Sequence, residues 1–193
     1  MRITLVQALF VHLGLGLSLD GLTRRTSDAI GVYNIPEATS FLQLDLAISI
    51  PSNVSTPDGV TALAPNAKGG KTSGAFEAEI LPVGAAYERV TENQAGENSF
   101  YNNRYIFQTA SNETISLEVD AILKYENNAL HGFGFGKFAT TIPDFFHLNY
   151  NSYLVEVSAD FTTGEAAGQV FALKSGGRRD GKPINALLPP GGS

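Results

Sequence analysis

Strict alternation between apolar and polar residues is the feature that most restricts how this chain can fold. In Phe41–Ile50 every second residue is aliphatic, and polar residues fill most of the positions between. In Phe76–Leu81, glutamates alternate with apolar residues in the same way. A period of two places successive side chains on opposite faces of a strand, so both segments predict strands with one buried face. The aliphatic face of the first segment consists of Leu42, Leu44, Leu46, Ile48 and Ile50.

Further short strands are predicted along the rest of the chain. Tyr101–Thr109 is rich in aromatic and β-branched residues, and the turn cluster 110–114 separates it from the next apolar run, which indicates an antiparallel hairpin. The other predicted strands are 60–63, 87–90, 115–125, 130–141, 153–161 and 169–174. Eight to eleven short strands with little helix predict an all-β domain. A closed antiparallel barrel is favoured because closure removes exposed sheet edges, and a sandwich is the alternative.

Glycine, proline and polar residues indicate the connections. Residues 51–70 and 91–99 are predicted to be loops, and a short helical turn is predicted near residues 36–38. Lys68–Thr72 lacks the first glycine of a phosphate-binding loop, and we interpret it as a glycine bend. In the strand 130–141, three successive positions on one face are glycines: Gly132, Gly134 and Gly136. Because these positions have no side chain, either a neighbouring element or a ligand can approach this face closely.

The N-terminus predicts entry into the secretory pathway. Met1-Arg2 precedes an apolar run to Leu19, which is typical of a signal peptide, and a buried N-terminal helix is the alternative. Sequons at Asn53 and Asn112 lie in predicted surface segments and are candidate glycosylation sites. We therefore expect a secreted or extracellular protein without stable membrane insertion once the leader is removed. Its predicted parts are a signal peptide (1–19), a leader (20–40), the barrel domain (41–174) and a flexible tail (175–193).

Composition excludes several classes of function. The net charge is −6 and the basic residues are scattered, so no basic stripe is available for nucleic acid. The absence of cysteine excludes disulfides, zinc–thiolate sites and cysteine nucleophiles. The histidines stand at no metal-ligand spacing, and no Gly-x-Ser-x-Gly motif is present. We expect neither a metal nor a cofactor.

Arg104 is the most informative candidate for chemistry, because an arginine within an aromatic strand is costly to bury unless it is paired. It either pairs with Glu118 or Asp120 across the hairpin or points into a cavity, where it would polarise a carbonyl. The carboxylate pairs Glu77/Glu79 and Glu118/Asp120 similarly face either a lumen or solvent. Other candidate donors are Tyr87, Tyr105, Tyr153, Lys137, His147 and Asn149. The phenylalanines form either the core or the wall of an apolar ligand site.

Several motifs share an order that resembles the DUF3237 family of small β-barrels. The resemblance covers roughly residues 41–174 and is carried by Gly74–Phe76, Leu81–Tyr87, Arg104–Thr109, Thr114–Ile115, Phe138–Pro143, Leu148–Asn149 and Gly168–Leu173. At two positions the chain departs from the pattern: Ala86 stands where an acid is expected, and Tyr87 where a tryptophan is expected. If that acid is catalytic in relatives, this chain lacks it.

The chain also resembles secreted fungal cyclases of this barrel class, the hetero-Diels–Alderases that join a tropolone o-quinone methide to a humulene-type alkene. The resemblance implies an apolar cavity holding both partners, a hydrogen-bond donor to the quinone methide carbonyl, and a group that assists loss of water. Arg104, Tyr105 or Tyr87 would be the donor, and His147 would assist. Substrate would contact Phe76, Phe107, Lys137, Phe138, Asn149 and Tyr153. The alternatives are a lipocalin-like carrier of an apolar molecule and a structural protein with a filled core; a homodimer is compatible with each.

Overall fold

The computed structural model describes residues 31–47, 49–57, 59–93 and 96–184. They divide into two compact units, of which Asn34–Gly177 contains every strand. The strands are β1 (Glu37–Ala47), β2 (Ser52–Thr56), β3 (Gly59–Pro65), β4 (Gly70–Gly74), β5 (Ala78–Ile80), β6 (Ala85–Asn93), β7 (Gly96–Gln108), β8 (Thr114–Glu126), β9 (Ala129–Ala139), β10 (Ser152–Asp160) and β11 (Glu165–Lys174). Within the described ranges, no helix is both long and apolar enough to cross a membrane.

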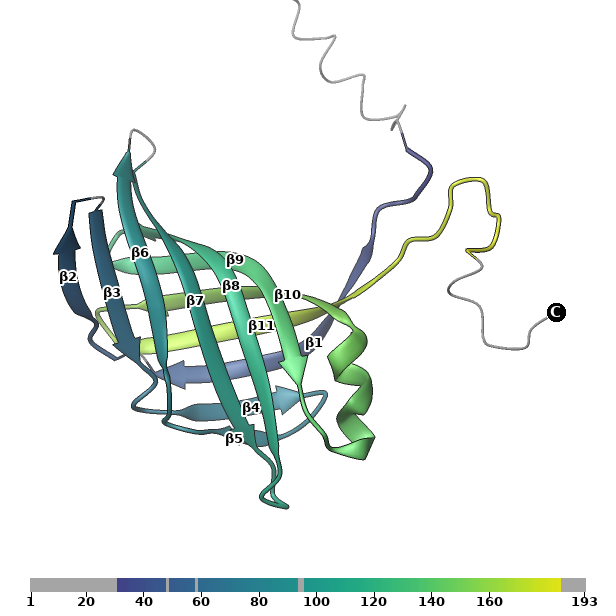
Figure 1. Ribbon diagram of the computed structural model, residues 1–193, viewed down its shortest axis with the longest axis horizontal. Helices are drawn as coiled ribbons and strands as arrows, with labels where there is room; N and C mark the ends of the chain where they lie inside the picture. Colours follow the sequence, from purple (N-terminus) through teal and green to yellow (C-terminus); the bar gives the residue numbers. More distant parts are fainter. Residues whose placement is uncertain (1–30, 48, 58, 94–95, 185–193) are drawn as a thin grey trace, which may run out of the picture. The chain divides into compact units, whose positions relative to one another are not determined.

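Eight strands close into an antiparallel barrel (Figure 1). Their order is β7-β5-β4-β1-β11-β10-β9-β8, and β8 pairs with β7 to complete the ring. Strand β7 is long enough to have two partners along its other edge: Phe107 and Gln108 pair with β5, whereas the stretch from Gly96 to Asn102 pairs with β6. Strands β6, β3 and β2 therefore extend the wall beyond the ring. The predicted all-β class and closed barrel are confirmed.

The predicted inward faces are also confirmed where the structure describes them. Leu42 and Leu44 are fully buried, and so is Ile80, while the glutamates on either side of Ala78 are exposed. Ile48 lies outside the described residues, and Ile50 is exposed because β1 ends at Ala47. Alternation thus identified the buried face of each strand but not the strand's end.

One end of the barrel is filled by aromatic rings and covered by a 3-10 helix, η2 (Pro143–Tyr150). Leu148 of η2 is buried, and the ring of Phe145 lies 5.4 Å from that of Phe76. Four further aromatic residues meet at this end: Phe41, Phe107, Phe138 and Tyr153. The sequence pattern did not predict this helix, because its apolar residues follow no long helical period.

Three predictions about connections were wrong. Residues 37–40 belong to β1, where pairing of Glu37 with Lys174 replaces the predicted helical turn. The predicted loop 51–70 contains β2, and the short strand predicted at 60–63 is confirmed as part of β3. The predicted loop 91–99 is largely a hairpin of β6 and β7. Residues 37–40, β2 and the hairpin are mainly polar, so ladder hydrogen bonds to a neighbour decide their conformation without an apolar pattern. The bend before β4 is confirmed, with Gly69 at a φ of 62°.

The glycine-rich side of β9 faces neighbouring strands. A Cβ at Gly132 would overlap Leu123, one at Gly134 would overlap the backbone of Asp120, and one at Gly136 would lie 2.7 Å from Val155. The face of β9 that carries these glycines therefore packs against atoms of β8 and β10 and does not contact a ligand.

The second unit includes the described residues 31–33 and 178–184. Here Tyr33 and Arg178 form an isolated antiparallel bridge, and Arg178 pairs with Asp180 at 2.5 Å. The predicted signal peptide (1–19) and most of the predicted leader lie outside the described residues.

Candidate functional site

A cavity lies at the barrel end opposite η2. Its volume is about 140 Å³, and it opens to solvent. Most of its lining is apolar, with Leu46, Ile80, Ala86, Leu123, Leu130 and Val157 among the residues. The two barrel ends differ because phenylalanine rings fill one, whereas alanines, aliphatic residues and tyrosines border the cavity at the other.

Three polar residues of β7 project into this cavity. Tyr101, Asn103 and Tyr105 share the inward face because they occupy alternate positions of a strand. The hydroxyl oxygens of the two tyrosines lie 2.8 Å apart, and Asn103 Nδ2 donates to the Tyr101 hydroxyl at 2.8 Å. Reciprocal hydrogen bonds of 3.1 Å to Asn66, in the turn after β3, hold the Asn103 amide in place.

Burial keeps both tyrosines protonated. The loss of solvation raises the pKa of Tyr101 well above its ordinary value and also raises the pKa of Tyr105. The negative charge of Glu88 raises both further, because it disfavours a second anion nearby. The cavity thus holds neutral hydroxyl groups able to donate hydrogen bonds at neutral pH.

Glu88 is the carboxylate of the cavity lining and is only 6% exposed. Alternation along β6 turns it inward with Ala86, while Tyr87 lies on the outer face. Its Oε2 atom accepts hydrogen bonds from Ser99 Oγ at 3.1 Å and from the hydroxyl group of Tyr125. These two donors offset part of the cost of burying a charge.

The four predicted catalytic residues do not come together. Tyr105 lines the cavity, whereas Tyr87 is 49% exposed on the outer face of β6. His147 is exposed on η2 and is absent from the cavity lining.

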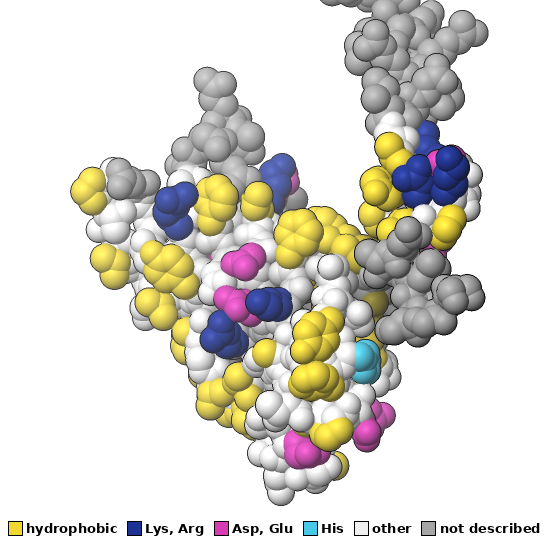
Figure 2. Space-filling view, turned by 45° about the vertical axis from the view of Figure 1, so that its right-hand side comes forward, with side chains coloured by type: hydrophobic (Ala, Val, Ile, Leu, Met, Phe, Trp, Pro, Cys, Tyr) yellow, Lys and Arg dark blue, Asp and Glu magenta, His cyan; other side chains and the backbone are white. Residues whose placement is uncertain are grey.

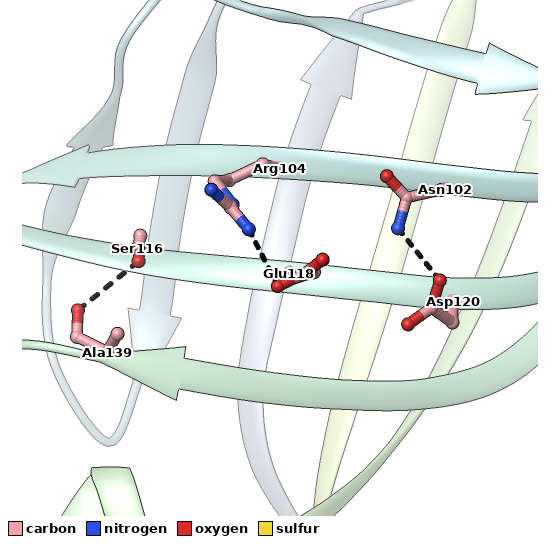
Figure 3. Close-up of polar contacts among 6 residues, drawn as sticks. All are labelled: Asn102, Arg104, Ser116, Glu118, Asp120 and Ala139. Atoms are coloured by element: carbon pink, nitrogen blue, oxygen red, sulfur yellow. Dashed lines mark hydrogen bonds and ion pairs between the residues drawn. The ribbon is translucent and has the colours of Figure 1, made fainter.

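Arg104 also lies on the outer face, where its Nη2 atom meets Glu118 Oε2 at 2.7 Å (Figure 3). Its side chain is 62% exposed, so the cross-strand pair predicted as the structural alternative is confirmed. Alternation explains the placement, since Arg104 stands between the inward residues Asn103 and Tyr105. Hydrogen bonding to Arg104 lowers the pKa of Glu118.

The two carboxylate pairs are likewise outside the lumen. Asp120 is exposed and accepts a hydrogen bond of 2.7 Å from Asn102 Nδ2, as Figure 3 also shows. Glu77 and Glu79 are exposed beside β5. Figure 2 shows basic and acidic side chains side by side on the outer surface, among hydrophobic ones. The solvent-facing alternative holds for both pairs.

The predicted substrate-binding aromatics belong to the filled end. The ring of Phe107 lies 5.9 Å from that of Phe76, and the ring of Phe138 lies 4.8 Å from that of Tyr153. All four residues are buried, and none lines the cavity. They form core contacts rather than a ligand wall.

Lys137 and Asn149 are also distant from the cavity lining. Lys137 is exposed on β9, opposite Glu118 in the ladder. Asn149 accepts a hydrogen bond from Thr140 N and donates to Thr140 O, both at 2.9 Å, which fastens η2 to the chain after β9.

Sequence reasoning missed most of the polar site. Glu88, Tyr101, Asn103 and Asn66 were not selected, although the alternation of Tyr101, Asn103 and Tyr105 was available as a signal. No group of three or more His, Asp or Glu side chains in the described part of the chain is arranged to hold a metal ion.

Exposed apolar residues also mark the outer wall over β6–β9, where Arg89 Cζ lies 5.0 Å from the centre of the Phe100 ring. The other exposed apolar residues on this outer wall, each about half exposed or more, are Tyr87, Ile122, Phe133 and Phe135. The predicted homodimer stays a prediction.

Comparison with solved structures supports the barrel. A Clostridium acetobutylicum protein of unknown function is 16% identical, with a TM-score of 0.62 over 72% of this chain and 100% of the other. A β-barrel-like Acinetobacter baumannii protein is 15% identical, with a TM-score of 0.62 over 73% and 98%. A protein described as an enzyme from Penicillium herquei is 16% identical, with a TM-score of 0.52 over 75% and 100%. At these identities the likeness shows the fold alone.

Sequence comparison gives the family. No curated protein matches the chain. The family described as "Protein of unknown function (DUF3237)" matches residues 36–167, which is more than half of the sequence and agrees with the resemblance found in its motifs. The chain therefore belongs to the DUF3237 family.

Proposed function

We propose that this protein is a cofactor-independent cyclase that acts on an apolar small molecule in the barrel cavity. One observation carries the proposal: Tyr101, Tyr105 and Asn103 form a hydrogen-bonded group within a largely apolar lining. Donors fixed in a water-poor site stabilise negative charge that develops on a substrate oxygen, and they need little reorganisation to do so. The Penicillium herquei enzyme supports the proposal only in that a similar barrel is an enzyme there.

The specific reaction we propose is the hetero-Diels–Alder joining of a tropolone o-quinone methide to a humulene-type alkene. Tyr105 and Tyr101 would polarise the quinone methide carbonyl, and confinement of both partners would lower the entropic barrier. A cavity of 140 Å³ resembles the roughly 150 Å³ apolar cavity that holds benzene. It therefore suits the ring of the tropolone partner, while the bulkier alkene would occupy the open mouth.

The test is product analysis after the full chain is incubated with a quinone-methide precursor and humulenol. We expect a cycloadduct of single stereochemistry. Its rate should fall about 100-fold in Tyr105→Phe, which removes a donor without changing the shape of the ring. Arg104→Ala is the matched control, because this residue faces outward, and it should keep the wild-type rate. A Tyr105→Phe variant with full activity and selectivity would contradict the proposal.

A non-catalytic carrier is the second candidate, favoured by the mainly apolar lining of the cavity. Native mass spectrometry of the same mixtures distinguishes the two. A carrier retains one partner without forming a product, and its affinity changes little in Tyr105→Phe. A cyclase releases product, and its turnover depends on the tyrosine.

A further inference from the structure

The cavity brings a carboxylate and hydroxyl donors face to face. Glu88 on β6 and Tyr101 on β7 are directly paired across the ladder, and both line the cavity. Directly opposed residues have Cβ atoms about 4.5–5.5 Å apart, so a group of about one ring's size contacts both side chains. Tyr105 lies beyond Tyr101 on the same strand face, and Asn103 between them donates its amide hydrogens to Tyr101 and Asn66.

The carboxylate is oriented, because one of its oxygens is held by two donors. Both hydrogen bonds, from Ser99 and Tyr125, reach Oε2. Among the hydrogen bonds of the described residues, none reaches Oε1. A buried carboxylate with an uncommitted oxygen in a cavity has the geometry of a general base.

We propose that Glu88 removes a proton from the carbon next to a carbonyl group, and that Tyr101 and Tyr105 hold the carbonyl oxygen. The substrate class is a ring ketone of about benzene size whose substituents extend into the mouth. The inference uses the cavity of the proposed cyclase but describes a separate activity, enolisation.

The step balances without any co-reactant. The α-carbon's proton moves to Glu88 Oε1, its C–H electron pair becomes a C=C bond, and the carbonyl π pair moves to oxygen. The resulting enolate oxygen accepts a hydrogen bond from one hydroxyl group of the tyrosine pair, while the other hydroxyl donates within the pair. Return of the proton to the same carbon, or to a conjugated one, regenerates a ketone and the Glu88 carboxylate. A carboxylate base opposite a tyrosine-containing oxyanion site in an apolar pocket is the arrangement that isomerises ring ketones elsewhere.

Each neighbouring group has a part in this arrangement. Ser99 and Tyr125 hold Oε2 of the carboxylate, which leaves Oε1 for the substrate proton. The raised pKa of Tyr101 and of Tyr105 keeps both hydroxyl groups as donors rather than anions. The cavity volume of about 140 Å³ matches a reacting part the size of a single ring.

The experiment uses cyclohexanone as the probe and follows deuterium uptake at its α-carbons by NMR in D₂O. The full-length protein should accelerate exchange over buffer. The rate should fall by roughly 10²–10⁴ in Glu88→Gln, which preserves the shape but removes the base. It should fall about 100-fold in Tyr105→Phe. Arg104→Ala, on the outer face, is the control expected to match the wild type.

Phenol is a second probe, because it resembles a flat enol and tests the site without any substitution. It should inhibit exchange by the wild-type protein and should still bind Glu88→Gln, which shows that the variant is folded. Exchange that persists at saturating phenol overturns the inference. So does a folded Glu88→Gln that exchanges at the wild-type rate, or a wild-type protein that binds phenol without accelerating exchange.

The outcomes also separate this inference from the proposed cyclase. Formation of the cycloadduct without α-exchange overturns the enolisation alone. Exchange that depends on Glu88, without any cycloadduct, supports the enolisation and contradicts the Diels–Alder reaction.

Discussion

The hydroxyl oxygens of Tyr101 and Tyr105 lie 2.8 Å apart, although four positions along β7 separate the two residues. At the rise of a strand their backbones are about 13 Å apart, so the side chains must lean toward each other over Asn103. Asn103 donates to Tyr101 and is itself held by Asn66. The contact joins three inward positions of one strand into a single polar group inside an apolar cavity.

Alkaline pH should destabilise the protein through its buried tyrosines. Burial raises the pKa of Tyr101, Tyr105 and Tyr153, so the folded state keeps protons that the unfolded chain loses above pH about 10. The contribution of these groups is therefore complete below pH about 10 and declines as the pH rises toward their folded pKa values. Urea unfolding at pH 8, 10 and 11, with tyrosinate absorbance at 295 nm, measures both effects.

The absorbance of Tyr101, Tyr105 and Tyr153 should rise only together with unfolding. Tyr105→Phe should show a weaker loss of stability between pH 10 and 11 than the wild type. If all seven tyrosines titrate together near pH 10 while the fold stays intact, the assignment of buried neutral tyrosines is wrong.

Removing the Arg104–Glu118 pair should have little effect on stability. Its side chains are 62% and 37% exposed, and exposed pairs contribute about 0–1 kcal/mol to the free energy of unfolding. Because Arg104 lowers the pKa of Glu118, the contribution is present above the unfolded carboxyl pKa of about 4.3 and disappears as the pH falls. A double-mutant cycle with Arg104→Ala and Glu118→Gln, by urea unfolding at pH 7 and pH 3, tests this. A coupling of several kcal/mol would show that Arg104 has a role beyond this surface pair.

Gly134→Ala should destabilise the barrel by about 1–3 kcal/mol, the usual cost of inserting atoms into a packed site. A Cβ at this position would overlap the backbone carbonyl group of Asp120 and the Cα atom of Ala121 on β8. Gly31→Ala is the matched control, because a Cβ there meets no atom within 4 Å. Thermal unfolding compares the two, and equal midpoints for Gly134→Ala and wild type would contradict the close approach of β8 and β9.

Expression of the full chain in a eukaryotic secretory host should add glycans at Asn53 and Asn112. Asn53 is exposed on β2, whose outer edge has no partner strand in the described sheet. Asn112 is exposed in the β7–β8 turn, with a φ of 61°. Each Asn→Gln variant should lose one mobility step on a gel, and enzymatic deglycosylation should bring all forms together. Wild-type protein secreted at its unmodified mass would contradict use of the sequons.

The strands that sequence reasoning found are those with an apolar inner face, such as β1, β5, β8 and β10. The strands that it missed or shortened, above all β2 and the β6–β7 hairpin, are polar and depend on a neighbour. Arg104 and Tyr105 show the same limit at the site. Both were selected for their chemistry, but adjacent positions of a strand point to opposite faces, and only Tyr105 faces the cavity.

The sequence by itself determined the all-β class, the inward faces of several strands and the exclusion of cysteine-based chemistry. These follow from local properties, the period of the side chains and the residue types present. Only the tertiary structure decided which strands close the ring, that aromatic rings fill one end, and that Glu88 faces Tyr101 across the other. Those relations join residues distant in sequence, and they depend on ladder register and on the volume left after packing. Neither quantity is encoded in any single segment of the chain.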